Sequence, residues 1–203
     1  MTTNNKFSTA VAAAALLCGL SLCGLAQAAD AKPDPLAALA RFIGEWTGVS
    51  SGEPGDGEVT RSYRYLMNKR YVQETNISRY PAQAKNKSGE VHEHLSMFSH
   101  DKARKLIVLR QFHVEGFVNT FRQALPTEGV EGKATLVFDS EAFENLSSSW
   151  QARESYEFLS DDEFIEVFEL APPGKPFSVY SRSHFRRKPS ADQQLPSLSG
   201  SRP

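Results

Sequence analysis

The sequence predicts an all-β fold, an antiparallel up-and-down barrel of about ten strands that is closed or nearly closed. From Gly44 onward the hydropathy alternates with a period of two, which is typical of β-strands. Short turn sequences separate these segments, and only antiparallel neighbours can be joined by so few residues. A Gly-x-Trp sequence at Gly44 to Trp46 opens the first strand. The strands are predicted over residues 45–51, 58–67, 70–79, 90–99, 105–114, 117–124, 133–144, 150–158, 163–170 and 177–187.

A short amphipathic helix is predicted ahead of the first strand. Asp34 and Pro35 supply an N-cap residue and a proline at the first helical position. Leu36, Leu39 and Phe42 then form an apolar stripe along one side. We expect this helix to cover one end of the barrel.

The two ends of the chain are predicted to lie outside the barrel domain, which we place at residues 34–188. Residues 1–29 contain Lys6, an apolar run and a small-residue cleavage sequence, the three parts of a secretory signal peptide. A membrane helix and a lipoprotein signal are the alternatives for this segment. We expect bacterial export to the periplasm or the medium, with no stable membrane insertion after cleavage. Residues 189–203 are rich in Ser and Pro and predict a disordered tail.

The composition excludes several classes of function. Both cysteines, Cys18 and Cys23, lie in the predicted signal peptide, so the mature chain would have no thiol nucleophile, no Cys-ligated zinc and no disulfide. Removing Lys6 from the 23 basic residues leaves 22 against 24 acidic residues, a net charge of −2 with neutral histidines. No basic stripe is present, so nucleic acid is not an expected partner.

The hairpin near residue 115 predicts the wall of a ligand cavity. If its turn has two residues, Phe112 faces Asn119 and Arg110 faces Phe121, so these four share one surface with Val108, Val114 and Phe117. That surface is mostly apolar with a few polar groups set into it, as in ligand pockets. The predicted ligand-binding residues are Tyr63, Arg110, Phe112, Asn119, Phe121 and Tyr156.

The spacing Gly44-x-Trp46-x-Gly48, with the preceding helix and the meander of strands, resembles the calycin superfamily of lipocalins and fatty-acid-binding proteins. It is similar in particular to nitrobindin-like haem-binding barrels and to secreted bacterial lipocalin-like proteins. In lipocalins the first-strand Trp packs at the closed end against a basic residue of the last strand. The resemblance therefore implies that Trp46 packs against Arg182, Arg186 or Arg187.

The resemblance to nitrobindin-like barrels also implies haem as a possible cofactor. A histidine near the C-terminal end of the domain ligates the iron in those proteins, and His184 is the candidate by position. His113 is the second candidate for an axial ligand. Otherwise no cofactor is expected.

Two further groups of residues carry possible chemistry. His92 and His94 share a strand face and, with a carboxylate, could hold a divalent metal ion. Counting across the next turn places Arg110 opposite His94, so no metal site is predicted. The carboxyl groups of the later strands, including Glu154 and Glu166, could act as acid and base, but surface ion pairs with arginines are the simpler interpretation.

These observations together favour a binding protein rather than an enzyme. We expect an exported, non-enzymatic barrel that holds a small hydrophobic or amphipathic molecule in its cavity. A haem-binding barrel with chemistry at the iron is one alternative. A structural or interaction module, its barrel filled by its own side chains, is the other.

Overall fold

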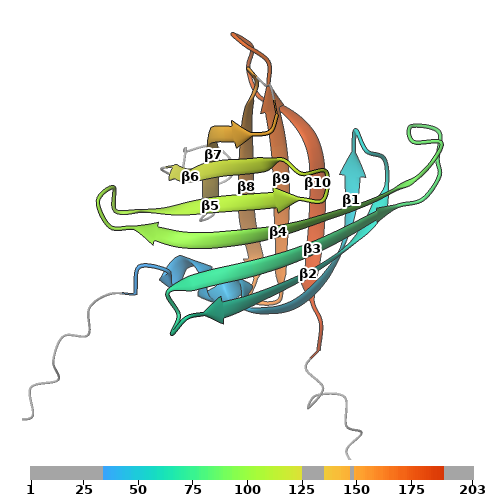
Figure 1. The fold of residues 1–203 in the computed structure, drawn as a ribbon. Helices are drawn as coiled ribbons and strands as arrows, with labels where there is room; N and C mark the ends of the chain where they lie inside the picture. The colour runs from blue at the N-terminus through green and yellow to red at the C-terminus, as the bar shows by residue number, and fades with distance from the viewer. Residues whose placement is uncertain (1–33, 125–134, 147–148, 190–203) are drawn as a thin grey trace, which may run out of the picture. The chain divides into compact units, whose positions relative to one another are not determined.

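A computed structural model of the chain describes residues 34–124, 135–146 and 149–189. In these residues ten antiparallel strands close into a barrel, as the sequence predicts, with β10 pairing with β1 and every other strand pairing with its neighbours along the chain (Figure 1). The predicted signal peptide lies outside the described residues, and so does the predicted tail beyond Pro189. Within the described part, no helix is long and apolar enough to cross a membrane.

The strand bounds follow the predicted segments to within about two residues, a normal spread for such assignments. The strands are β1 Gly44–Gly52, β2 Gly57–Leu66, β3 Tyr71–Tyr80, β4 Glu90–Asp101, β5 Leu106–His113, β6 Val118–Ala124, β7 Thr135–Glu144, β8 Gln151–Ser160, β9 Glu163–Ala171 and β10 Ser178–Arg187.

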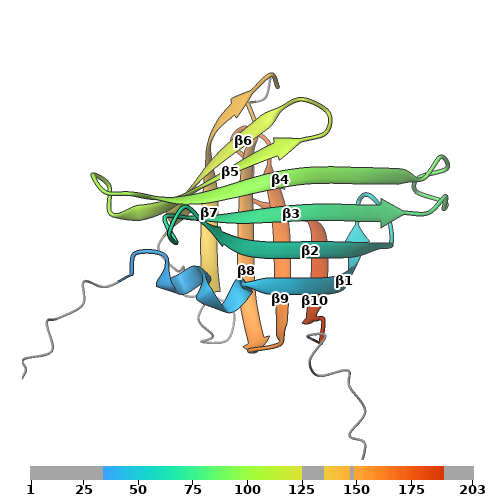
Figure 2. The same cartoon turned by 60° about the horizontal axis from the view of Figure 1, so that its bottom comes forward.

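The predicted helix is a 3₁₀-helix, η1, over Ala37–Phe42. The prediction of Asp34 as the N-cap is wrong, because the helix begins at Ala37 with Leu36 at the N-cap position. The Asp34 carboxylate instead accepts a hydrogen bond from the Leu36 backbone N–H at 2.9 Å, in the turn before the helix. Leu36, Leu39 and Phe42 are buried, so the apolar stripe faces the barrel as expected. Figures 1 and 2 show the helix lying against one end of the barrel. We call the opposite end the mouth.

The closed end contains the contact that the lipocalin resemblance implies. Trp46 is fully buried, and the guanidinium carbon of Arg187 lies 4.2 Å from the centre of its ring. Arg187 also donates to the backbone oxygens of Ile43 (2.7 Å) and Arg41 (2.8 Å), next to the helix. The prediction is therefore confirmed with Arg187 as the partner, and the contact joins the first strand, the last strand and the helix.

Gly48, the last residue of the Gly44-x-Trp46-x-Gly48 motif, is required by the packing of two strands. A Cβ atom at Gly48 would lie 2.6 Å from the backbone oxygen of His184 and 2.9 Å from the ring of Phe185. Only glycine permits this approach of β1 to β10. The motif therefore belongs to the seam where the barrel closes.

Candidate functional site

The interior of the barrel changes from apolar to polar between the closed end and the mouth. Near the helix it is filled by aromatic rings, with Phe42 within 5.2 Å of four others, measured between ring centres. Above them lies a layer of charged and amide side chains, and histidines lie nearer the mouth. Among the described residues, the buried charged side chains are Arg61, Glu74, Glu154 and Glu166.

Arg61 is the centre of the charged layer. It extends from β2 across the interior and donates two hydrogen bonds to the Glu166 carboxylate of β9, at 2.8 and 2.6 Å. Its Nε atom donates to Asn76 at 2.7 Å and lies 3.4 Å from Glu74 Oε1. Such a two-point pair is the strongest geometry available to a buried arginine. The layer therefore fixes β2, β3 and β9 relative to one another.

Glu154 and Glu166 differ in protonation although they are neighbours. Burial raises the pKa of Glu154 well above its usual value, and its hydrogen bond with Glu166 and the charge of Glu166 add to the shift. Burial would also raise the pKa of Glu166, but Arg61 overrides this, and the pKa lies below the usual value. Of the two carboxyl groups, Glu154 is therefore the one that holds a proton more readily, and it donates a hydrogen bond to Glu166. Gln111 donates to Glu154 at 3.0 Å.

Three histidines converge between this layer and the mouth. His92 and His94 come from β4 and His113 from β5, where His113 lies directly opposite His94. One ring nitrogen of each lies within 4.8 Å of one nitrogen of each of the others. Burial, with His94 and His92 close by, lowers the pKa of His113 to about 3, so its ring is neutral at physiological pH.

The interior also contains polar atoms without a hydrogen-bond partner in the described part of the protein. They belong to interior positions of β3, β4, β6 and β8, and each is fully buried. The atoms are Glu74 Oε2, His94 Nδ1, Ser96 Oγ, Asn119 Oδ1 and the Tyr156 hydroxyl. Leaving one such group unpaired costs about 1–3 kcal/mol. This set of atoms, which we call the open polar set, is the strongest sign of a binding site.

Four of the six predicted ligand-binding residues lie in the barrel interior. Tyr63 and Tyr156 are buried near the charged layer, and the Tyr63 hydroxyl accepts a hydrogen bond from Arg61 at 3.3 Å. Asn119 lies beside His113, with its amide nitrogen 3.2 Å from His113 Nε2. Phe121 is fully buried deeper in the interior.

The other two residues lie on the outer face of the barrel. Arg110 is exposed, and Phe112 is 44% exposed. The predicted register is wrong by one residue, because Gln111, and not Phe112, pairs with Asn119. The turn has three residues, with Gly116 N–H bonded to the His113 oxygen at 2.9 Å and Gly116 at a φ of 90°. A slip of one residue moves every side chain to the opposite face.

The same kind of error affected the histidines. His94 lies opposite His113, and Arg110 lies opposite Met97, so the predicted cation beside His94 is wrong. The reason is a four-residue turn after Asp101, whose carboxylate accepts hydrogen bonds from the backbone N–H groups of Ala103 (2.9 Å) and Arg104 (3.1 Å). The prediction places a five-residue turn at residues 100–104, whereas β4 continues to Asp101 and the turn lies later in the chain, which changes the register of β4 against β5.

His184, the first haem-ligand candidate, lies on the outer face. Its Nε2 atom is 2.6 Å from Glu163 Oε1, and its side chain is 38% exposed. His113 lies inside, stacked on Phe117 with 4.1 Å between the ring centres. Both of its ring nitrogens have a nearby nitrogen, from His92 at 3.3 Å and from Asn119 at 3.2 Å. Of the two, only His113 faces the interior.

The interpretation of the acidic residues as surface ion pairs holds for some and fails for others. Asp162 pairs with Arg187 at 2.8 Å on an exposed part of the β8–β9 turn, as predicted. Glu154 and Glu166 are buried instead, so for these two the surface interpretation is wrong. Sequence reasoning also missed Arg61 and Glu74. A signal was present for Arg61, which lies between Val59 and Tyr63 on the inward face of β2. Glu74 gives less signal, because Asn76 and Ser78 follow it on the same face of β3.

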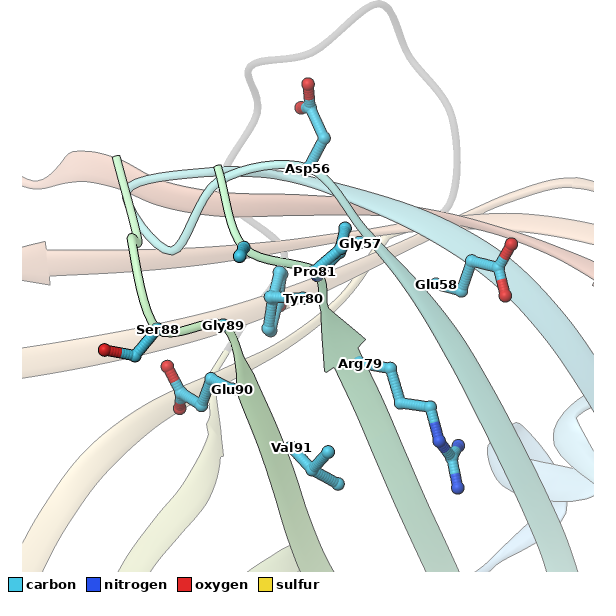
Figure 3. A pocket seen from close by; sticks show the side chains of 11 residues that line it. Asp56, Gly57, Glu58, Arg79, Tyr80, Pro81, Ser88, Gly89, Glu90 and Val91 are labelled. Atoms are coloured by element: carbon cyan, nitrogen blue, oxygen red, sulfur yellow. The ribbon is translucent and has the colours of Figure 1, made fainter. Parts of the chain in front are cut away.

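A hollow of about 830 Å³ lies outside the interior, at the rim between the β1–β2 and β3–β4 connections. Figure 3 shows Tyr80 beside Gly57, with Glu58 and Arg79 extending from neighbouring strands. Tyr80 fills the inner side of the hollow, where its ring would contact a Cβ atom at Gly57 at 2.5 Å. None of the six predicted ligand-binding residues lines this hollow.

Comparison with known proteins supports the fold. No protein-family model matches the chain, and no curated protein matches it. Among solved structures, the chain is similar to the crystal structure of Rv2717c from M. tuberculosis, with a TM-score of 0.53 and 14% sequence identity. The match covers 76% of this chain and 98% of that one. At this identity the likeness concerns the fold alone, and the ten-stranded barrel fits a calycin-like architecture.

Proposed function

We propose that this protein is an exported, non-enzymatic barrel that binds a small amphipathic molecule between its mouth and its charged layer. The open polar set carries this proposal. At about 1–3 kcal/mol for each unpaired group, its five atoms would cost roughly 5–15 kcal/mol. That equals the whole stability of a typical domain. A bound molecule with hydroxyl or amine groups would satisfy both the acceptors and the hydroxyls of the set.

The surroundings of the open polar set indicate the character of the molecule. Glu74 Oε2 and Asn119 Oδ1 are acceptors, so the polar group of the ligand carries hydrogen-bond donors. Phe117, partly buried beside His113, offers an apolar surface on the side of the mouth. We therefore favour a ligand with a donor-bearing head directed inward and an apolar body directed to the mouth.

Native mass spectrometry of the protein purified from its own host tests the proposal. The expected result is a bound species that is lost after denaturation and refolding. Tyr156→Phe and Asn119→Leu, which each remove an atom of the open polar set, should reduce the bound fraction. Phe112→Leu, on the outer face, is the matched control and should leave it unchanged. A barrel that is empty in every preparation supports the filled structural module instead.

Haem binding is the alternative that the resemblance to nitrobindin-like barrels provides, and His113 is its interior candidate. The close neighbours of the His113 ring do not favour it, because a haem needs open space beside the ligating nitrogen and each His113 nitrogen has another side chain within 3.3 Å. Haem titration tests it directly. A Soret band that disappears in His113→Ala would replace the small-molecule proposal, and the absence of a band would remove haem.

Export is part of the proposal and has its own test. Residues 1–29 have the composition of a cleaved signal peptide. N-terminal sequencing of the protein isolated from its host should show a chain that begins at Ala29 or Asp30. Recovery of the uncleaved chain from the cytoplasm would contradict this.

A further inference from the structure

The three histidines near the mouth form a compact triangle. Their ring centres are 5.7 Å apart between His92 and His94, and 5.3 Å apart from each of these to His113. His92 and His94 are two residues apart on β4 and share its inward face, and His113 lies across from His94 on β5. Two rigid neighbouring strands therefore present three imidazoles to one point.

The distances suit a metal ion with nitrogen ligands. His92 Nε2 and His113 Nδ1 are 3.3 Å apart. In a tetrahedral zinc site with Zn–N distances of about 2.0–2.1 Å, two ligand nitrogens are about 3.3–3.4 Å apart. His94 Nδ1 is buried and has no partner in the described part of the protein. One nitrogen of each ring is thus available on the side where the three rings meet.

The other nitrogen of each ring has a partner of the kind that supports metal ligands. His94 Nε2 is 3.0 Å from Glu74 Oε1, and His92 Nδ1 is 2.9 Å from Glu115 Oε1. Ligating histidines commonly donate this second N–H to a carboxylate or an amide oxygen, which orients the ring. His113 Nε2 lies beside the Asn119 amide, and rotating that amide by 180° brings its unpartnered Oδ1 to the ring.

The charge of the interior also favours a cation. The buried charged side chains of the described residues comprise three carboxyl groups and a single guanidinium, and Arg61 is already engaged by Glu166. Arg110, which the sequence placed beside His94, lies on the outer face. The reason for predicting no metal site is therefore removed.

We propose that His92, His94 and His113 bind one divalent transition-metal ion, with zinc as the best-fitting example, through His92 Nε2, His94 Nδ1 and His113 Nδ1. Three imidazoles leave a fourth coordination position for water or for a donor atom of a bound molecule. Imidazole sites suit zinc, copper, nickel and iron, whereas magnesium and calcium prefer oxygen ligands. This inference goes beyond the proposed function. It uses two atoms of the open polar set, His94 Nδ1 and Asn119 Oδ1, and leaves Glu74 Oε2, Ser96 Oγ and the Tyr156 hydroxyl for a small molecule.

A second group shares one of these histidines and must be distinguished. One ligand atom each from Glu90, His92 and Glu115 also lies within 4.8 Å of the others, but both carboxylates are exposed. An ion there would have one nitrogen and mainly oxygen ligands. The two sites therefore differ in their dependence on His113 and on Glu90.

Zinc titration of the full chain, produced without a histidine tag, tests the proposal. Isothermal titration calorimetry with ZnSO₄ should show one ion per chain. His113→Asn should weaken the affinity by at least about 100-fold, because it removes a ligand and not only one of its supporting partners, whose loss costs about 10–100-fold. Glu90→Gln should leave the affinity unchanged. His184→Asn, which removes an outer-face histidine that also contacts a glutamate, is the matched control.

X-ray absorption of the zinc-loaded wild-type protein supplies a readout that needs no variant. Three imidazole nitrogens at about 2.0–2.1 Å are expected. A shell dominated by oxygen, a loss of binding in Glu90→Gln with binding retained in His113→Asn, or no zinc binding by the wild type would each overturn the proposal. A chain that binds zinc but never carries a small molecule refutes only the proposed function.

Discussion

Replacing Glu154 by glutamine should stabilise the protein increasingly as the pH rises. Glu154 is buried, its pKa is raised well above the usual value, and it donates to ionised Glu166. In the unfolded chain its carboxyl group ionises near the ordinary value of about 4.3. Above that pH the folded state holds a proton that the unfolded state has released. Raising the pH therefore favours unfolding.

The magnitude follows from the one-proton difference. The free energy of unfolding of the wild type loses about 1.4 kcal/mol per pH unit through Glu154, from about pH 5 up to the pKa in the folded state. Glu154→Gln lacks this proton and keeps an N–H donor toward Glu166. Its advantage over the wild type should therefore grow by about 1.4 kcal/mol for each pH unit between the pKa in the unfolded chain and the raised pKa in the folded state.

Urea unfolding followed by tryptophan fluorescence at several pH values measures this difference. Glu45→Gln, which removes an exposed carboxyl group on β1, is the matched control and should give a curve parallel to the wild type. Parallel curves for Glu154→Gln and the wild type would refute the assignment of the proton to Glu154. A Glu154→Gln variant that loses stability relative to the wild type as the pH rises would refute it as well.

Three other substitutions test the packing by urea unfolding. Arg61→Met should lower the free energy of unfolding by about 3–5 kcal/mol, because it leaves Glu166 and Glu74 buried without their cation. The double variant Arg61→Met/Glu166→Leu should recover part of this loss. If the single variant is as stable as the wild type, the charged layer does not hold the strands together. Phe121→Ala should lower the free energy of unfolding by about 3–5 kcal/mol, because Phe121 is fully buried. Phe112→Ala, at a partly exposed position on the outer face, should lower it much less. Equal losses in the two variants would contradict the observed register. Trp46→Phe removes the indole N–H that donates to the Phe42 backbone oxygen at 2.6 Å, and it should lower the free energy of unfolding by about 1–3 kcal/mol. An unchanged urea midpoint would show that this hydrogen bond contributes little to stability.

Strand positions could be predicted from the sequence because alternation and turn residues are local signals. The ten predicted segments correspond to β1–β10, and the short helix is found where Leu36, Leu39 and Phe42 predict it. The Trp46 contact with a last-strand arginine was available from the resemblance of a five-residue motif. These features depend on residues close together in the chain, or on a pairing that every closed barrel of this type requires.

The candidate site could not be predicted to the same extent because it depends on register. A turn of three residues, where two were expected, moved Arg110 and Phe112 outside and brought Gln111 and His113 inside. Glu154 and Glu166 look like surface residues in the sequence because acidic residues are usually exposed. Inside the barrel Glu166 is paired with Arg61, 105 residues away in the chain, and Glu154 accepts from Gln111, 43 residues away, so neither partner gives a local signal.

The seam between β1 and β10 has a consequence for the order in which the molecule can assemble. Trp46 on β1 pairs with Arg187 on β10, so one edge of β1 stays unpaired until β10, the last strand to be synthesised, is available. Until then β1 and β9 both present unpaired backbone groups, which are templates for pairing with other chains. A chain that stops before Ser178 should therefore aggregate rather than form a nine-stranded barrel. In this protein the final strand completes folding and also ends the period in which the nascent chain is exposed to association.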